Sequence, residues 1–85
     1  MYQIVVKPSA KRELKKLIPR TLALIADKIE SLAMNPRPDG CKKLVSNREE
    51  LWRVKVGEYR ILYAIDDEIR IVDIHHVGHR REIYR

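Results

Sequence analysis

Two short hydrophobic runs near the middle of the chain carry basic side chains at alternate positions. The first run is LWRVKV, the second is YRILYAI, and Gly57-Glu58 separates them. Because successive side chains of a β-strand point to opposite faces, Arg53 and Lys55 share one face of the predicted sheet. A two-residue hairpin loop places Arg60 directly opposite Lys55 on that face. Like charges in this position destabilise a sheet, so we expect that a function requires these three basic residues on the same face.

The end of the chain adds further cationic and aromatic groups. Gly78 is expected to break the last strand, so the segment after it leaves the sheet beside the ends of its neighbours. Some of its side chains are then expected to reach the basic face, from the set His79, Arg80, Arg81, Tyr84 and Arg85. Arginine binds phosphate through two hydrogen bonds, lysine supplies a point charge, and a tyrosine ring stacks on a base. This combination favours RNA over a small anion.

The same groups suffice to cleave RNA without a metal or other cofactor. A base must take the proton of a 2′-hydroxyl, cations must stabilise the pentavalent phosphate, and an acid must protonate the leaving 5′-oxygen. Lys55 is a candidate base because the cations on either side of it are expected to lower the pKa of its ammonium. The alternative is a solvated or partner-binding face without catalysis.

Other residues that could do chemistry have simpler interpretations. Three carboxylates fit turns, strands and arginine pairs better than a metal cluster: Asp66, Asp67 and Asp73. His75 and His79 have a weak metal-ligand spacing, with no third ligand placed beside them. Trp52 is expected to anchor the core. Cys41 is the only cysteine, which excludes an internal disulfide and suggests a bystander thiol in a reducing compartment.

The hydrophobic pattern predicts the elements that position these residues. We expect strands at 2–7, 51–56, 59–65 and 68–77, and helices at 10–18 and 22–33. Ser9 and Thr21 are placed to cap the helices, and Pro19 to end the first one. The order β-α-α-β-β-β predicts one small α+β domain over residues 1–85, with two helices packed on one face of an antiparallel-dominated sheet.

The expected register also divides the remaining side chains between two faces. A turn at Asp66-Asp67 puts Ile61 and Val72 under the helices, although a one-residue slip would exchange the faces of the last strand. An apolar strip then lies on the other face, beyond the basic residues: Leu62, Ala64, Ile69 and Ile71. Four cations crowd one face of the first helix and are either solvated or in contact with RNA phosphates: Lys11, Arg12, Lys15 and Lys16.

Composition limits the classes of protein that fit. The 85 residues include 18 Lys and Arg against 12 Asp and Glu, a formal net charge of +6. This excess suggests a polyanionic partner, nucleic acid first. No apolar run approaches the about 18 residues that span a bilayer, and the N-terminus lacks the apolar region of a signal peptide. We therefore expect a soluble, cytoplasmic protein with no membrane partner.

The whole chain resembles the RelE family of bacterial and archaeal toxins. The resemblance rests on LWRVKVGEYRILYAI and on VGHRREIY. The RelE/ParE superfamily shares the first motif broadly, whereas the terminal GHRREIYR is more similar to the RelE branch. The resemblance implies a toxin of a type II toxin–antitoxin system that cleaves mRNA codons in the ribosomal A site. It also implies a cognate antitoxin that wraps the toxin and holds it inactive, and the apolar strip fits an antitoxin helix.

The resemblance further implies roles for individual residues. Lys55 would be the general base, and Arg53 would add electrostatic stabilisation. Arg60 and Arg80 would bind the scissile phosphate, although Arg81 is an alternative to Arg80 as the second of these arginines. Tyr84 would stack on or orient the target nucleotide. The leaving-group acid would be Arg60, Arg80 or His79.

Two rival functions share this fold. The first is a ParE-like inhibitor of DNA gyrase, which does not need the basic catalytic residues. The second is a non-catalytic module that binds nucleic acid and antitoxin. It would be either an inactive relative or a protein whose complex with the antitoxin binds operator DNA through the antitoxin and represses its own operon. Codon preference and the identity of the antitoxin do not follow from the sequence.

Overall fold

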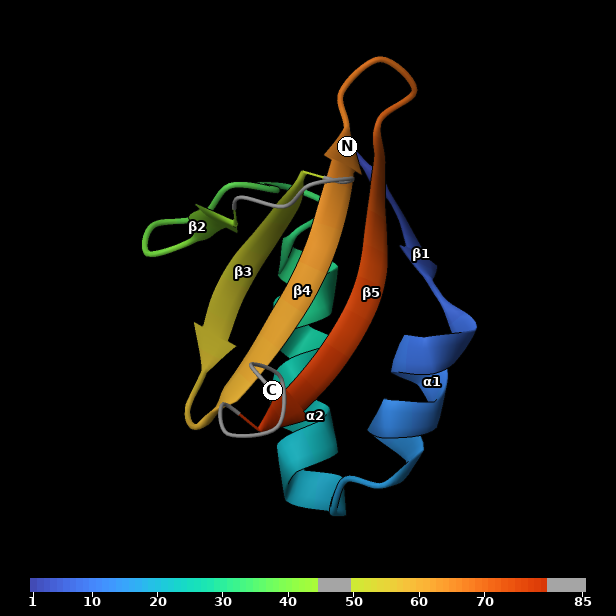
Figure 1. Ribbon diagram of the computed structural model, residues 1–85, viewed down its shortest axis with the longest axis vertical. Coiled ribbons are helices and arrows are strands. Elements are labelled where there is room, and N and C mark those ends of the chain that lie inside the picture. Colours follow the sequence, from blue (N-terminus) through green and yellow to red (C-terminus); the bar gives the residue numbers. More distant parts are fainter. Residues whose placement is uncertain (45–49, 80–85) are drawn as a thin grey trace.

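The computed structural model describes residues 1–44 and 50–79. Within them, five strands form one sheet in the order β1-β5-β4-β3-β2, and β1 alone runs parallel to its neighbour. α2 lies behind the sheet and α1 lies beside β5, below β1 (Figure 1), and both helices contribute to one core. The elements are β1 (Gln3–Val6), α1 (Pro8–Lys15), α2 (Pro19–Ser31), β2 (Lys42–Leu44), β3 (Leu51–Val56), β4 (Tyr59–Asp66) and β5 (Ile71–His79). The predicted α+β fold is confirmed, with β2 as an additional strand.

The hydrophobic core lies between the two helices and the sheet. Ala10 of α1 and Ile25 of α2 are fully buried in it. Ile61 and Val72 are also fully buried, so their predicted position under the helices is confirmed. No described helix has the length and apolar character needed to cross a membrane.

The helix starts differ from the sequence prediction. α2 begins at Pro19, so this proline starts the second helix and does not end the first, which finishes earlier at Lys15. Proline suits the first helical position because the amide hydrogen that it lacks would have no partner there. Thr21 therefore lies inside α2 and cannot cap it. Ser9 lies inside α1, and its hydroxyl donates to the carbonyl oxygen of His75 at 2.7 Å.

The β3–β4 hairpin has the predicted register. Its loop is Gly57-Glu58, and Gly57 has a φ of 59°, a left-handed conformation that glycine adopts without strain. Lys55 consequently pairs with Arg60, and Arg53 pairs with Leu62. The sequence prediction for the basic residues is confirmed at the level of the backbone.

The β4–β5 connection is longer than predicted. Asp66 Oδ1 accepts the backbone N–H groups of Glu68 and Ile69 at 3.0 and 3.2 Å, which holds these residues in a turn. The last strand therefore begins at Ile71, not at residue 68, and it continues through Gly78 to His79. Gly78 does not break the strand because it still pairs with Arg60.

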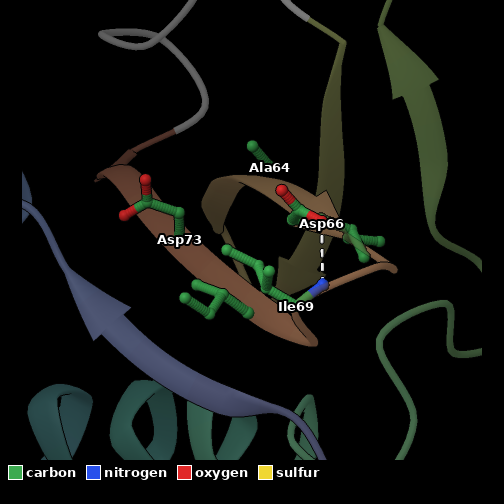
Figure 2. Close-up of a pocket in the computed structure, with 6 residues that line it drawn as sticks. Ala64, Asp66, Ile69 and Asp73 are labelled. Atoms are coloured by element: carbon green, nitrogen blue, oxygen red, sulfur yellow. Dashed lines mark hydrogen bonds between the residues drawn. The ribbon is translucent and has the colours of Figure 1, made fainter.

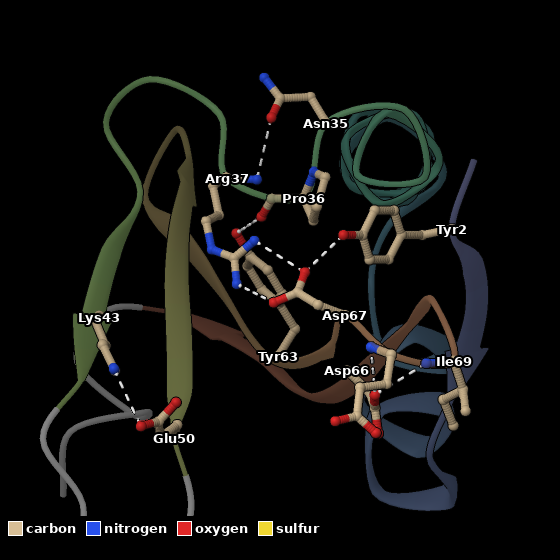
Figure 3. A network of polar contacts seen from close by, with 11 residues as sticks. Tyr2, Asn35, Pro36, Arg37, Lys43, Glu50, Tyr63, Asp66, Asp67 and Ile69 are labelled. Carbon is tan, nitrogen blue, oxygen red and sulfur yellow. Dashed lines mark hydrogen bonds and ion pairs between the residues drawn. The ribbon is translucent and has the colours of Figure 1, made fainter.

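A polar network fastens the α2–β2 connection to the β4–β5 turn (Figure 3). The Arg37 guanidinium donates to both carboxylate oxygens of Asp67, at 3.2 and 2.9 Å, and the Tyr2 hydroxyl donates to Asp67 Oδ1 at 2.6 Å. Arg37 also lies 5.1 Å from the ring centroid of Trp52, which packs against the core as predicted. Burial raises the pKa of the Tyr63 phenol, which donates to the carbonyl oxygen of Pro36.

This network predicts a stability change in acid. The hydrogen bonds from Arg37 and Tyr2 lower the pKa of Asp67 from 3.8 to about 2. A lowered folded-state pKa adds stability that is complete above the usual pKa, so this contribution is lost as the pH falls from about 4 to about 2. We expect Asp67→Asn to lower the urea midpoint at pH 6 and to match the wild type near pH 2. Asp39→Asn, a change of an exposed carboxylate, is the control. A difference in urea midpoint between Asp67→Asn and the wild type that does not change with pH would contradict the prediction.

Candidate functional site

The basic cluster (Arg53, Lys55 and Arg60) lies on the sheet face that points away from the helices. Val54 and Ile61 alternate with these residues along β3 and β4 and are buried in the core, which fixes the opposite direction for the cluster. Lys55 is exposed and Arg53 is half-buried. β2 adds Lys42, which pairs with Arg53 and extends the row of cations. Lys42 was not predicted as part of this row because β2 was not predicted.

Arg60 differs from its neighbours in being almost fully buried. It is 8% exposed, and its Nε has no hydrogen-bond partner among the described residues. It pairs with Lys55 on one side and with Gly78 on the other. A buried N–H without an acceptor destabilises a fold, and a cation opposite another cation adds to this effect. Arg60 therefore has a buried guanidinium N–H that lacks an acceptor among the described residues.

His79 lies on the other face of the sheet. It pairs with Tyr59, and the two rings meet edge to face with centroids 5.6 Å apart. Because β5 continues through Gly78, the alternation of side chains is kept and His79 points away from Arg60. His79 is therefore not one of the residues that reach the basic face, and this placement counts against His79 as the leaving-group acid.

The four cations of the first helix form a separate surface. α1 packs against β5, on the side of the sheet away from β3 (Figure 1). All four are exposed: Lys11, Arg12, Lys15 and Lys16. An RNA that touches both surfaces would have to pass around the edge of the sheet, so RNA binding by α1 stays a prediction.

The predicted apolar strip is present on the open face beside the β4–β5 turn. A pocket of about 330 Å³ lies there, lined by Ala64, Ile65, Asp66, Ile69, Ile71 and Asp73 (Figure 2). Ile69 is 66% exposed at its rim, whereas Leu62 is buried. The pocket thus combines an apolar floor with two carboxylates.

The three aspartates have the structural roles expected of them. Asp66 caps its turn and Asp67 pairs with Arg37, while Asp73 forms an ion pair with Lys7 at 3.2 Å. His75 Nε2 lies 3.9 Å from the same Asp73 carboxylate. Within residues 1–44 and 50–79, no three potential ligands are grouped as a metal ion would require.

Glu13 is a contact residue that the sequence analysis missed. Its carboxylate accepts the backbone N–H of Val77 at 3.1 Å and lies 3.3 Å from His76 Nδ1. The available signal was a single acidic residue in a helix whose other charged residues are all basic.

Four predicted site residues lie outside the described residues: Arg80, Arg81, Tyr84 and Arg85. Their assigned roles stay predictions from the family resemblance.

Two helices on one face of a five-stranded mixed sheet, with a basic hairpin on the other face, define a RelE-type toxin fold. The toxin–antitoxin complex RelBE2 of Mycobacterium tuberculosis contains a chain with a TM-score of 0.82 and 35% identity, covering 93% of this chain and 98% of its own. The isolated RelE toxin of E. coli gives a TM-score of 0.78 at 25% identity, covering 99% of this chain and 92% of the RelE chain.

Sequence comparison agrees with the fold. Toxin RelG of Mycobacterium tuberculosis is 38% identical over 85 residues, which cover 99% of this chain and 97% of RelG. Residues 4–84 match the family described as the ParE toxin of the type II toxin–antitoxin system parDE. The chain therefore belongs to the RelE/ParE superfamily of toxins from type II toxin–antitoxin systems.

Proposed function

We propose that the protein is a ribosome-dependent mRNA endoribonuclease that acts in the cytoplasm on the codon in the A site. The observation that carries the proposal is the pairing of exposed Lys55 with Arg60, whose buried Nε has no acceptor among the described residues. An exposed amine beside a guanidinium that needs an anion suits attack on a phosphodiester. The similarity to toxins named RelG and RelE adds support.

The proposed reaction needs no metal. The Lys55 amine takes the proton of the 2′-hydroxyl, and the 2′-oxygen forms a bond to phosphorus. Arg60 and Arg53 stabilise the charge that develops on the phosphate, together with Arg80. The bond from phosphorus to the 5′-oxygen breaks, and an acid donates a proton to that oxygen. The products are a 2′,3′-cyclic phosphate and a 5′-hydroxyl.

The remaining roles fall on residues of the C-terminal segment. Tyr84 would stack on the target nucleotide or orient it. Arg81 and Arg85 would contribute further phosphate contacts, as would the four cations of α1. The leaving-group acid would be Arg60 or Arg80.

Inhibition of DNA gyrase is the second candidate function. The matching family description names ParE, which favours this activity as the alternative. It would make no use of a general base at Lys55. Toxicity with intact mRNA and stalled replication would identify it.

Primer extension on a defined mRNA tests the proposal. Purified protein is added to programmed ribosomes, with Arg80→Ala protein and mRNA without ribosomes as controls. We expect new cuts within the A-site codon that require ribosomes and that the Arg80→Ala protein does not produce. Intact mRNA in the presence of a toxic protein would overturn the endoribonuclease proposal.

We also propose a cognate antitoxin as the inhibitory partner, whose complex with this chain binds operator DNA through the antitoxin. Two solved relatives are toxin–antitoxin complexes, from Mycobacterium tuberculosis and Pyrococcus horikoshii. The pocket beside Ile69 offers an apolar floor with Asp66 and Asp73 at its side. An antitoxin helix with an apolar side chain next to a lysine or arginine would fit it.

Ile69→Asp is expected to weaken antitoxin binding about ten-fold or more, because burial of a large aliphatic side chain contributes roughly 1.5–3 kcal/mol. Isothermal titration with the antitoxin measures the change. The side chain is exposed in the free toxin, so folding and ribosome-dependent cleavage should stay unchanged. Met34→Asp places the same charge at another exposed apolar position and serves as the control. Equal affinities for Ile69→Asp and Met34→Asp would contradict the docking position.

A further inference from the structure

The outer edge of β5 changes its partner halfway along the strand. β1 pairs with β5 as far as Val6 and Ile74, and the N–H of Lys7 donates to the carbonyl oxygen of Ile74 at 2.9 Å. Beyond this point α1 lies beside β5, so its side chains are the nearest source of hydrogen bonds for that edge. A strand edge without partners would leave backbone donors and acceptors unsatisfied.

Two side chains of α1 supply the missing hydrogen bonds. The Ser9 hydroxyl donates to the His75 carbonyl oxygen at 2.7 Å, and Glu13 Oε1 accepts the Val77 N–H at 3.1 Å. Glu13 also lies 3.3 Å from His76 Nδ1. We call these contacts of Ser9 and Glu13 with residues 75–77 the α1–β5 latch. A hydrogen bond to a carboxylate is stronger than one between neutral groups, so Glu13 makes the firmer of the two attachments.

The latch spans an irregularity that sets the register at the basic cluster. Leu62 pairs with His76 but Tyr63 pairs with Ile74, so His75 is an extra residue, a β-bulge. Beyond this bulge, Gly78 is placed opposite Arg60. Bulges are found where a strand must be redirected next to a functional site.

We propose that Glu13 is a positioning residue for the cleavage reaction: it holds the end of β5 so that Gly78 stays opposite Arg60. This inference rests on the proposed function. An effect of charge alone would give a different result when Glu13 is replaced. Removing a carboxylate from a protein that binds RNA should strengthen its binding to the ribosome. A split between the cleavage rate and ribosome affinity therefore distinguishes the two accounts.

The test compares Glu13→Ala, Glu13→Gln and the charge-matched control Glu30→Ala, which changes an exposed residue of α2. Glu13→Ala is expected to lower the single-turnover cleavage rate at saturating ribosomes about ten-fold or more, since small displacements of reacting groups have large effects on rate. Its half-saturating ribosome concentration should not exceed that of Glu30→Ala. Glu13→Gln keeps an oxygen acceptor for Val77 and should restore the rate to within a few-fold of the wild type.

Amide hydrogen exchange at Val77 provides a readout that does not depend on activity. Exchange should be faster in Glu13→Ala than in Glu30→Ala and nearly unchanged in Glu13→Gln. If the wild type cleaves and Glu13→Ala cleaves as fast, the positioning role is wrong. If the wild type does not cleave on ribosomes, the proposed function fails, whereas the exchange experiment still decides whether the latch holds β5.

A second variant covers the case in which Glu13→Ala does not fold. Ser9→Ala removes the other hydrogen bond of the latch and is compatible with its helical position. It should lower the cleavage rate with unchanged ribosome affinity, by less than Glu13→Ala would. A wild-type rate for a folded Ser9→Ala protein would overturn the inference in that case.

Discussion

Replacing Lys55 with methionine is expected to slow mRNA cleavage on the ribosome about a hundred-fold or more, which is the usual contribution of a general base. Ribosome affinity should change only a few-fold. Lys55 is exposed and pairs directly with Arg60 in the register of β3 and β4, so the two side chains leave the same face of the sheet from neighbouring positions. Methionine keeps most of the length of the side chain and removes the amine.

Single-turnover cleavage over a range of ribosome concentrations separates the two effects of Lys55→Met. Lys43→Met is the matched control, because Lys43 lies on the neighbouring strand, opposite Trp52, and so points to the other face. Its ion pair with Glu50 is exposed and should contribute little to stability. Equal losses of cleavage and of affinity in Lys55→Met would make Lys55 a phosphate contact and not the base.

Arg60→Met is expected to reduce cleavage about a hundred- to a thousand-fold, as removal of one preorganised hydrogen-bond donor to a transition-state oxyanion does. The free energy of unfolding should stay within about 1 kcal/mol of the wild-type value or rise. The reason is that Arg60 is 8% exposed, faces another cation and has an Nε without a partner among the described residues. Methionine fills similar space without a buried charge.

Urea unfolding and the primer-extension assay together measure the two effects of Arg60→Met. Arg20→Met removes the same charge from an exposed position at the start of α2 and should change neither quantity. A folded Arg60→Met protein that cleaves at the wild-type rate would remove Arg60 from the mechanism. If that protein stayed toxic, gyrase would become the better candidate target.

The β3–β4 hairpin, and with it the position of Lys55 opposite Arg60, could be predicted from the sequence. Both depend on local physics: side chains alternate along a strand, and Gly57 adopts the left-handed conformation that a two-residue loop requires. The faces of Ile61, Ala64 and Ile71 followed from the same alternation, whereas Ile69 lies in the β4–β5 turn. The helices also followed from their periodicity, although Pro19 starts the second helix and does not end the first, and Ser9 and Thr21 lie inside the helices that they were predicted to cap.

Tertiary contacts decided the rest, because nothing within a few residues of the chain encodes them. The β2 strand forms by pairing with β3, and β5 continues through Gly78 by pairing with β4, which turns His79 toward Tyr59 and away from the cluster. The contact of Glu13 with Val77 joins residues 64 positions apart. The burial of Arg60 likewise does not follow from local sequence, since a basic residue on a strand face is usually exposed.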